Sequence, residues 1–154
     1  MDSCSGKLET ELTALLDGRK TVELRKSIYA LQEQMLQQEQ LDLPIVNHFS
    51  HKIYGREMRM TKGMVVIGKI HKFEQLNILS KGDVTVVTDD GPIRVTAGFH
   101  LVAPPGAKRA FYAHEDSVWT VIHGTEETDV ELIEQHFIAQ SEQEYLDFLL
   151  EDKS

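Results

Sequence analysis

The sequence has 154 residues, of which 41% are hydrophobic and 27% are charged, and its formal net charge is −9. This composition is typical of a single globular domain that buries a core of its own. The negative charge argues against broad nucleic-acid binding, because phosphate contacts need clustered lysine and arginine. No apolar run approaches the about 18 residues of a membrane helix.

The amino-terminal sequence contains no apolar segment of the kind found in signal peptides. Cys4 is the one cysteine, so the chain cannot form an internal disulfide, which suits a reducing compartment. We therefore expect a cytoplasmic protein without a membrane partner. Nucleic acid is not an expected partner either.

Residues 1–45 are predicted to form a helical extension, since helical periodicity runs through residues 7–41 without a proline. A first short helix would place three leucines on one face: Leu8, Leu12 and Leu15. A second helix is expected from about Thr21 to Leu41, with an apolar seam: Leu24, Ile28, Leu31 and Met35. Such a seam is typical of a coiled coil between chains, but it also suits a helix that packs on its own barrel. The sequence leaves both arrangements open.

Residues 46–125 are predicted to form a β-barrel, because short β-type runs alternate with turn residues from Ile53 to His123. The runs are Met64–Ile70, Glu74–Leu79, Val84–Thr88, Ile93–Thr96, His100–Ala103, Lys108–Tyr112 and Val118–His123. No interval between them is long enough for a helix, which excludes a parallel α/β sheet. Trp119 and Val121 share a strand face and are expected in the barrel core.

Residues 126–154 are predicted to be helical again. Thr128 or Asp129 could cap a helix with three apolar residues on one face: Val130, Ile133 and Phe137. Ser141 followed by Glu144 resembles a capping box for a last short helix, in which Tyr145, Phe148 and Leu149 are apolar.

The turn residues of the β zone recur at fixed spacings: Gly63, Gly82, Gly98, Pro104 and Gly106. In this register the zone resembles the cupin family, whose two sequence motifs place glycine and proline at these points. The resemblance covers residues 53–123 and implies a mainly β fold, the cupin-type double-stranded β-helix or jelly-roll barrel. The expected architecture adds N-terminal helices and a short C-terminal helical segment to this barrel.

The metal-binding half of the same motifs is largely replaced. Where metal-binding cupins carry two histidines, a glutamate and a later histidine, this chain has Lys69, His71, Gln75 and Arg109. Lysine and arginine offer no lone pair to a metal at neutral pH, and both repel a divalent cation. We therefore expect no cofactor and no metal at the usual site.

Strand alternation in the cupin register turns five polar side chains toward the barrel interior: Lys69, His71, Gln75, Asn77 and Arg109. We predict that they receive a small anion, or a carboxylate or phosphate group of a ligand. The alternative is that Lys69 and Arg109 pair internally with acidic residues, for which the candidates are Glu57, Glu74 and Glu115. A rearranged metal site is a further hypothesis, with His71, Glu74 and His114 as its ligands.

Three functions remain open. The first is a non-catalytic cupin that acts as an oligomeric structural or interaction module, since the resemblance implies dimerisation through barrel faces. The segment from Ile70-His71-Lys72 to Asn77-Ile78-Leu79 also resembles small cupins encoded by tailed bacteriophages, which implies a virion or host-cytoplasm location. The second is a cupin that binds a small anionic ligand. The third is a metal-dependent isomerase or dioxygenase with a rearranged site.

Overall fold

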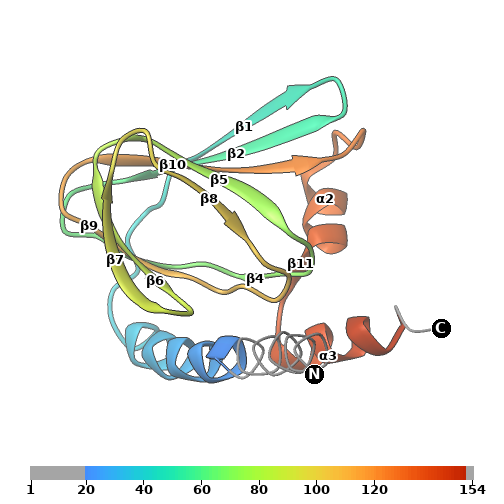
Figure 1. The fold of residues 1–154 in the computed structure, drawn as a ribbon, viewed down its shortest axis with the longest axis horizontal. Coiled ribbons are helices and arrows are strands. Elements are labelled where there is room, and N and C mark those ends of the chain that lie inside the picture. The colour runs from blue at the N-terminus through green and yellow to red at the C-terminus, as the bar shows by residue number, and fades with distance from the viewer. Residues whose placement is uncertain (1–19, 152–154) are drawn as a thin grey trace, which may run out of the picture.

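The structure, a computed structural model, describes residues 20–151, in which two larger antiparallel sheets face each other and a third sheet has two strands (Figure 1). The five-stranded sheet has the order β1 (Ile45–Ser50), β2 (Ile53–Met60), β10 (Ser117–Gly124), β5 (Gln75–Lys81) and β8 (His100–Ala103). The four-stranded sheet has the order β3 (Val65–Ile67), β9 (Ala110–Ala113), β6 (Asp83–Thr88) and β7 (Gly91–Thr96). Most neighbours in these sheets are not consecutive in the chain, which is the strand order of a jelly roll. The predicted fold class is confirmed.

The turn glycines explain why this spacing specifies the barrel. Gly63, Gly82, Gly98 and Gly106 all have positive φ angles, of 86°, 98°, 97° and 84°. At Gly82 a Cβ would also lie 2.1 Å from the Ser117 side-chain oxygen, so the turn between β5 and β6 excludes any larger residue. The turn half of the motif therefore fixes the fold without the metal-binding half.

The predicted barrel, residues 46–125, covers nearly all of the β1–β2 hairpin, but the individual runs predicted within it begin at Met64, so neither strand was identified. The first strand of the hairpin, IVNHFS, shows no clean alternation of apolar and polar residues, so only its partner marks it as β. The predicted run Met64–Ile70 is two strands, because β3 ends at Ile67 and β4 covers Ile70–His71. A short strand within the C-terminal segment, β11 (Ile138–Ala139), pairs with β4.

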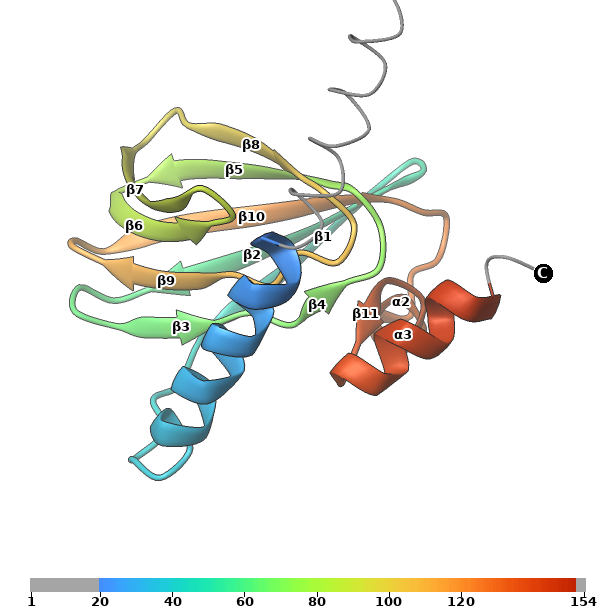
Figure 2. The ribbon, with the colours of Figure 1, turned by 60° about the horizontal axis from the view of Figure 1, so that its bottom comes forward.

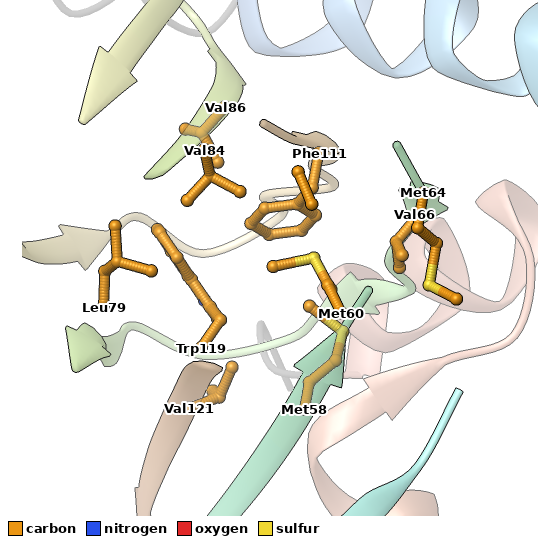
Figure 3. Close-up of a cluster of buried hydrophobic side chains, with 11 residues drawn as sticks. Met58, Met60, Met64, Val66, Leu79, Val84, Val86, Phe111, Trp119 and Val121 are labelled. Carbon is orange, nitrogen blue, oxygen red and sulfur yellow. The ribbon is translucent and has the colours of Figure 1, made fainter. Parts of the chain in front are cut away.

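One half of the barrel is filled by apolar side chains (Figure 3). Its members come from both sheets, and they include Met60, Leu79, Val84, Val86, Phe111 and Trp119. Leu79, Val84 and Val86 are fully buried. Trp119 and Val121 belong to this cluster, as the sequence predicted.

The N-terminal helix, which covers residues 20–35 of the described chain, lies along the smaller sheet beside helix α3 (Glu142–Glu151) (Figures 1 and 2). Arg25 is buried and donates two hydrogen bonds to Glu142, at 2.9 and 2.8 Å, and one to the Gly106 carbonyl at 3.1 Å. Ile28 is 3% exposed, whereas Leu31 of the predicted seam is 39% exposed. The helix therefore packs on its own barrel.

The predicted end of this helix at Leu41 is wrong, because the helix stops at Met35 and a turn follows. Leu36 and Leu41 are exposed, so no packing holds the glutamine-rich continuation in a helix. The predicted first helix with Leu8, Leu12 and Leu15, together with Cys4, lies outside the described residues. No helix in the described range is long and apolar enough to cross a membrane.

Helix α2 (Val130–Phe137) stands at one end of the barrel (Figure 1). Asp129 caps it by accepting a hydrogen bond from the Glu131 amide, and Ile133 and Phe137 are buried, as predicted. At the start of α3 the Ser141 hydroxyl accepts from the Glu144 amide at 3.1 Å, while the Glu144 carboxylate accepts from the Gln140 amide. The predicted capping box is present in this shifted form.

Candidate binding cavity

A cavity of about 540 Å³ occupies the half of the barrel between the apolar cluster and helix α2. Strand register shows how its wall is layered, because residues that pair between neighbouring strands lie at the same level. Trp119 pairs with Met58 at the floor, and with Leu79 of the apolar cluster behind it. Val121 pairs with Arg56 and Asn77 one layer higher, so the wall changes from apolar to polar within two residues along β2 and β5.

The next layer, toward α2, is aromatic and polar. His123 pairs with Tyr54, which is 2% exposed and donates a hydrogen bond to Asn47. The His123 ring stacks on the rings of His71, at 5.6 Å between centroids, and Tyr54, at 6.3 Å. It also contacts Phe137 of α2 at 4.4 Å, so the helix closes this end of the cavity.

The cavity wall carries three cationic side chains and one carboxylate: Arg56, Lys69, Arg109 and Glu134. Lys69 is paired with Glu134 of α2, and the Lys69 ammonium lowers the pKa of that carboxyl. The Arg56 side chain forms no hydrogen bond or ion pair with any residue in the range 20–151. The wall therefore keeps a positive charge that this part of the protein does not neutralise.

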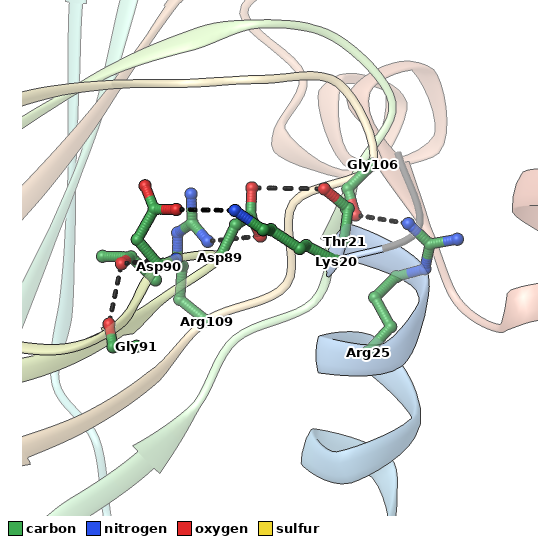
Figure 4. A network of polar contacts seen from close by, with 9 residues as sticks. Lys20, Thr21, Arg25, Asp89, Asp90, Gly91, Gly106 and Arg109 are labelled. Carbon is green, nitrogen blue, oxygen red and sulfur yellow. Dashed lines mark hydrogen bonds and ion pairs between the residues drawn. The ribbon is translucent and has the colours of Figure 1, made fainter. Parts of the chain in front are cut away.

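Arg109 connects the cavity to the N-terminal helix (Figure 4). Its side chain is 9% exposed and lies 3.5 Å from a carboxylate oxygen of Asp89, in the turn between β6 and β7. The other oxygen of Asp89 accepts a hydrogen bond from the Thr21 hydroxyl at 3.2 Å. Because one carboxylate serves both partners and the contact with Arg109 is long, the Arg109 charge is only partly compensated.

Three buried polar atoms of the cavity wall have no hydrogen-bond partner among the described residues: His71 Nδ1, Gln75 Oε1 and Arg109 Nε. Buried polar atoms in proteins are nearly always paired, and an unpaired one costs about 1–3 kcal/mol. Their concentration around one cavity indicates groups that are placed for a bound molecule or for water.

Both cavity histidines are neutral near pH 7. Burial lowers the pKa of His71 to about 3, with further lowering from His123, Arg56 and Arg109. Burial also lowers the pKa of His123 to about 4, and Arg56 and His136 add to this effect. Arg56 and Arg109 come from opposite sheets, and both act on His71, so their positive charges converge on the same region of the cavity.

The structure brings all five predicted ligand-binding residues to this cavity: Lys69, His71, Gln75, Asn77 and Arg109. Asn77 differs from the others, because its side-chain oxygen accepts a hydrogen bond from Trp119 Nε1 at 3.0 Å and its amide faces the Leu101 carbonyl. Asn77 therefore positions Trp119. The ligand-binding role of the other four stays a prediction.

Lys69 and Arg109 both pair with acidic residues of the protein, as the alternative prediction held, but the predicted partners are wrong. Lys69 pairs with Glu134 and Arg109 with Asp89, whereas Glu57 pairs with Arg59. Glu74 and Glu115 are exposed. The partner of Lys69 was missed because Glu134 reaches the cavity only where α2 returns to the barrel. Residue spacing within the β zone does not show this return.

Sequence reasoning also missed several residues of the wall: Asn47, Tyr54, Arg56, His123 and Glu134. Tyr54 and Arg56 could have been found once β2 was recognised, since they alternate with Met58 on one face. His123 could also have been found, since it lies two positions beyond Val121 on the same face.

The residues do not fit the metal that cupin barrels often hold. Lys69 and Arg109 supply positive charge at the usual ligand positions, and Gln75 is a poor ligand. The rearranged set is not assembled, because Glu74 is exposed and His114 contacts the Thr85 hydroxyl at 2.7 Å, away from His71. Within residues 20–151 no group of three or more His, Cys, Asp or Glu side chains could hold a metal ion.

The sequence matches no protein-family model and no curated protein. Solved structures similar to the chain include a cupin superfamily protein from Desulfitobacterium hafniense, with 13% identity, a TM-score of 0.47, and coverage of 58% of this chain and 83% of that protein. KdgF from Halomonas sp. has 18% identity, a TM-score of 0.47 and coverage of 60% and 88%. A cupin-2 domain protein from Shewanella frigidimarina has 15% identity, a TM-score of 0.43 and coverage of 61% and 91%.

These likenesses are too remote to indicate a function, and the cupin fold of this chain is argued from its strand order and turn glycines. Nothing in these likenesses links the chain to a bacteriophage, so the virion-associated role stays a prediction from the sequence.

Proposed function

We propose that this protein is a non-catalytic cupin-fold module that binds one small organic anion in its barrel cavity. The observation that carries the proposal is Arg56, a cation in the cavity wall whose side chain has no ion pair or hydrogen bond to residues 20–151. A guanidinium offers a planar set of donors that matches a carboxylate or phosphate group.

The remaining charges of the wall support the same ligand chemistry. Of the three cations, Lys69 lies beside Glu134 and Arg109 beside Asp89, so Arg56 is the one without a counter-ion among residues 20–151. Both histidines are neutral near pH 7 because burial lowers their pKa values to about 3 and 4. A neutral histidine offers one donor and one acceptor to a ligand. An anion would compensate the net positive charge, and its oxygens could accept a hydrogen bond from Arg109 Nε.

The test is a thermal-unfolding screen with small carboxylates and inorganic phosphate at pH 7.5. We expect at least one of these anions to raise the unfolding temperature of the wild type, since a ligand that binds only the folded state stabilises it. Arg56→Met should abolish the shift. Arg59→Met is the matched control, because Arg59 lies on the same strand but is exposed and pairs with Glu57.

An equal shift in Arg56→Met and wild type would overturn the proposal, as would the failure of every anion to shift the unfolding temperature.

A second candidate role is an oligomeric interaction module, in a virion or in a host cell. It is favoured by an apolar patch on the outer face of the five-stranded sheet. Leu76 and Val102 pair directly between β5 and β8 and are 38% and 59% exposed, and Leu76 also pairs with Ile122 of β10. Exposed apolar neighbours on one sheet face are typical of contacts between subunits.

Light scattering in solution tests this role. If the patch joins two copies, Val102→Lys should reduce the measured mass to that of one chain, because a lysine on each copy would place charge in the contact. Val65→Lys changes an exposed valine on the other sheet and should leave the mass unchanged. A wild-type mass of one chain would contradict the proposal.

A further inference from the structure

We infer that the anion bound in the cavity is amphipathic, with its charged group beside Arg56 and Arg109 and a flat apolar body against Met58, Phe111 and Trp119. This inference rests on the proposed function and names the class of ligand. Aromatic carboxylates with a short linker between ring and carboxylate have this chemistry.

The floor of the cavity is apolar. Met58, Phe111, Trp119 and Val121 all line the cavity and also belong to the apolar cluster of the barrel. The rings of Phe111 and Trp119 meet edge to face at 4.9 Å. Trp119 is only 1% exposed, and its indole N–H is already donated to Asn77, so the part of the ring that lines the cavity offers no free donor.

The spacing between the apolar floor and the charged layer matches the length of a small amphipathic molecule. Arg56 lies two residues from Met58 on β2, which separates their levels by roughly 7 Å. This is about the length of an aromatic ring with a short linker. The cavity, of about 540 Å³, is within the usual range for small-molecule sites, roughly 300–1,000 Å³.

The apolar floor also disfavours other classes of small anion. A sugar phosphate could offer its phosphate to Arg56, but its hydroxyl groups would then face Met58, Phe111 and Trp119. These side chains offer no free donor or acceptor, and each unpaired hydroxyl would cost about 1–3 kcal/mol. A short aliphatic acid would fill only the charged layer and leave the floor uncovered.

Trp119 is the only tryptophan in the sequence, so its fluorescence reports on the floor without a label. We would titrate the full chain at pH 7.5 with four probes: 3-phenylpropionate, 3-phenylpropionamide, propionate and glucose 6-phosphate. The expected result is a change in Trp119 emission with 3-phenylpropionate at a Kd at least tenfold below those of the other three. 3-Phenylpropionamide tests whether binding needs the negative charge, and propionate tests whether binding needs the apolar body.

Two variants separate the two parts of the site. Arg56→Met should weaken 3-phenylpropionate at least tenfold and leave 3-phenylpropionamide unchanged. Met58→Gln keeps the length of the side chain but makes the floor polar, so it should weaken 3-phenylpropionate and leave propionate unchanged. Met58→Leu is the apolar control, and an unfolding curve for each variant verifies that it folds.

The outcomes distinguish the inference from the proposed function. Binding of propionate or glucose 6-phosphate that depends on Arg56 and is as tight as that of 3-phenylpropionate would overturn the amphipathic ligand but support an anion site. If none of the four probes binds, the amphipathic ligand is rejected, and the thermal-unfolding screen then decides whether the anion site is rejected too.

Discussion

The two halves of the barrel are built from the same strands, yet one is packed and the other is hollow. On β2 the inward positions change from Met60 to Arg56, and on β5 from Leu79 to Gln75. The packed half buries side chains that need no partner, whereas the hollow half keeps polar atoms that lack one. Strand alternation decides which side chains point inward, and their chemistry decides whether they form core or site.

The largest expected effect is a loss of stability from a substitution in the packed half of the barrel. Leu79→Ala removes a fully buried side chain and should lower the free energy of unfolding by about 2–5 kcal/mol, because it leaves a cavity in a dense core. Gln75→Leu, four residues earlier on the same strand, should leave stability unchanged or raise it, since it removes the unpaired Oε1. Urea unfolding measures both. Similar losses in the two variants would mean that the halves do not differ in packing.

A second effect, of intermediate size, is the pH dependence of stability that the histidines of the hollow half cause. The folded-state pKa values of His71 and His123, about 3 and 4, lie below the usual 6.5, so the unfolded chain binds protons more readily. The stability contribution of the neutral rings is therefore complete above pH 6.5 and declines as the pH falls toward 4. Each histidine should add a slope that approaches about 1.4 kcal/mol per pH unit.

The measurement is urea unfolding between pH 6.5 and 5, a window above the usual pKa values of carboxyl groups. His71→Gln should flatten the pH dependence compared with wild type. An unchanged slope in this variant would show that His71 is not held neutral by burial in the cavity.

The smallest effect sharpens the charge balance of the cavity. Glu134→Gln removes the one carboxylate of the wall, and its ion pair with Lys69 joins side chains that are 39% and 51% exposed. Unfolding free energy should change by less than about 1 kcal/mol. The affinity for an anion should rise about twofold to fivefold, because Lys69 is released; calorimetric titration with 3-phenylpropionate measures it. A weaker affinity would mean that Glu134 itself contacts the ligand.

Much of the barrel could be predicted from the sequence because backbone constraints are local. Gly82 and Gly106 mark turns because their positive φ angles favour glycine, and the alternation around Asn77 assigns an inward face. The replaced metal ligands were visible for the same reason, since Lys69 and Arg109 stand at positions that the turn glycines define.

The rest of the site depends on contacts between distant segments. Glu134 and Phe137 reach the cavity because β11 pairs with β4 and returns α2 to the barrel, which a helical pattern alone does not indicate. Arg56 was missed because β1 and β2 lie outside the motif register. Arg56 thus lies in the β1–β2 hairpin, and the first strand of this hairpin shows no clean alternation of apolar and polar residues.

The most direct test of the hollow half is an experimental electron-density map of protein purified from cells without added ligand or affinity tag. We predict density for a small organic molecule with its anionic group between Arg56 and Arg109 and its body over Trp119. A metal ion coordinated by His71, or a cavity that holds only ordered water, would contradict the account.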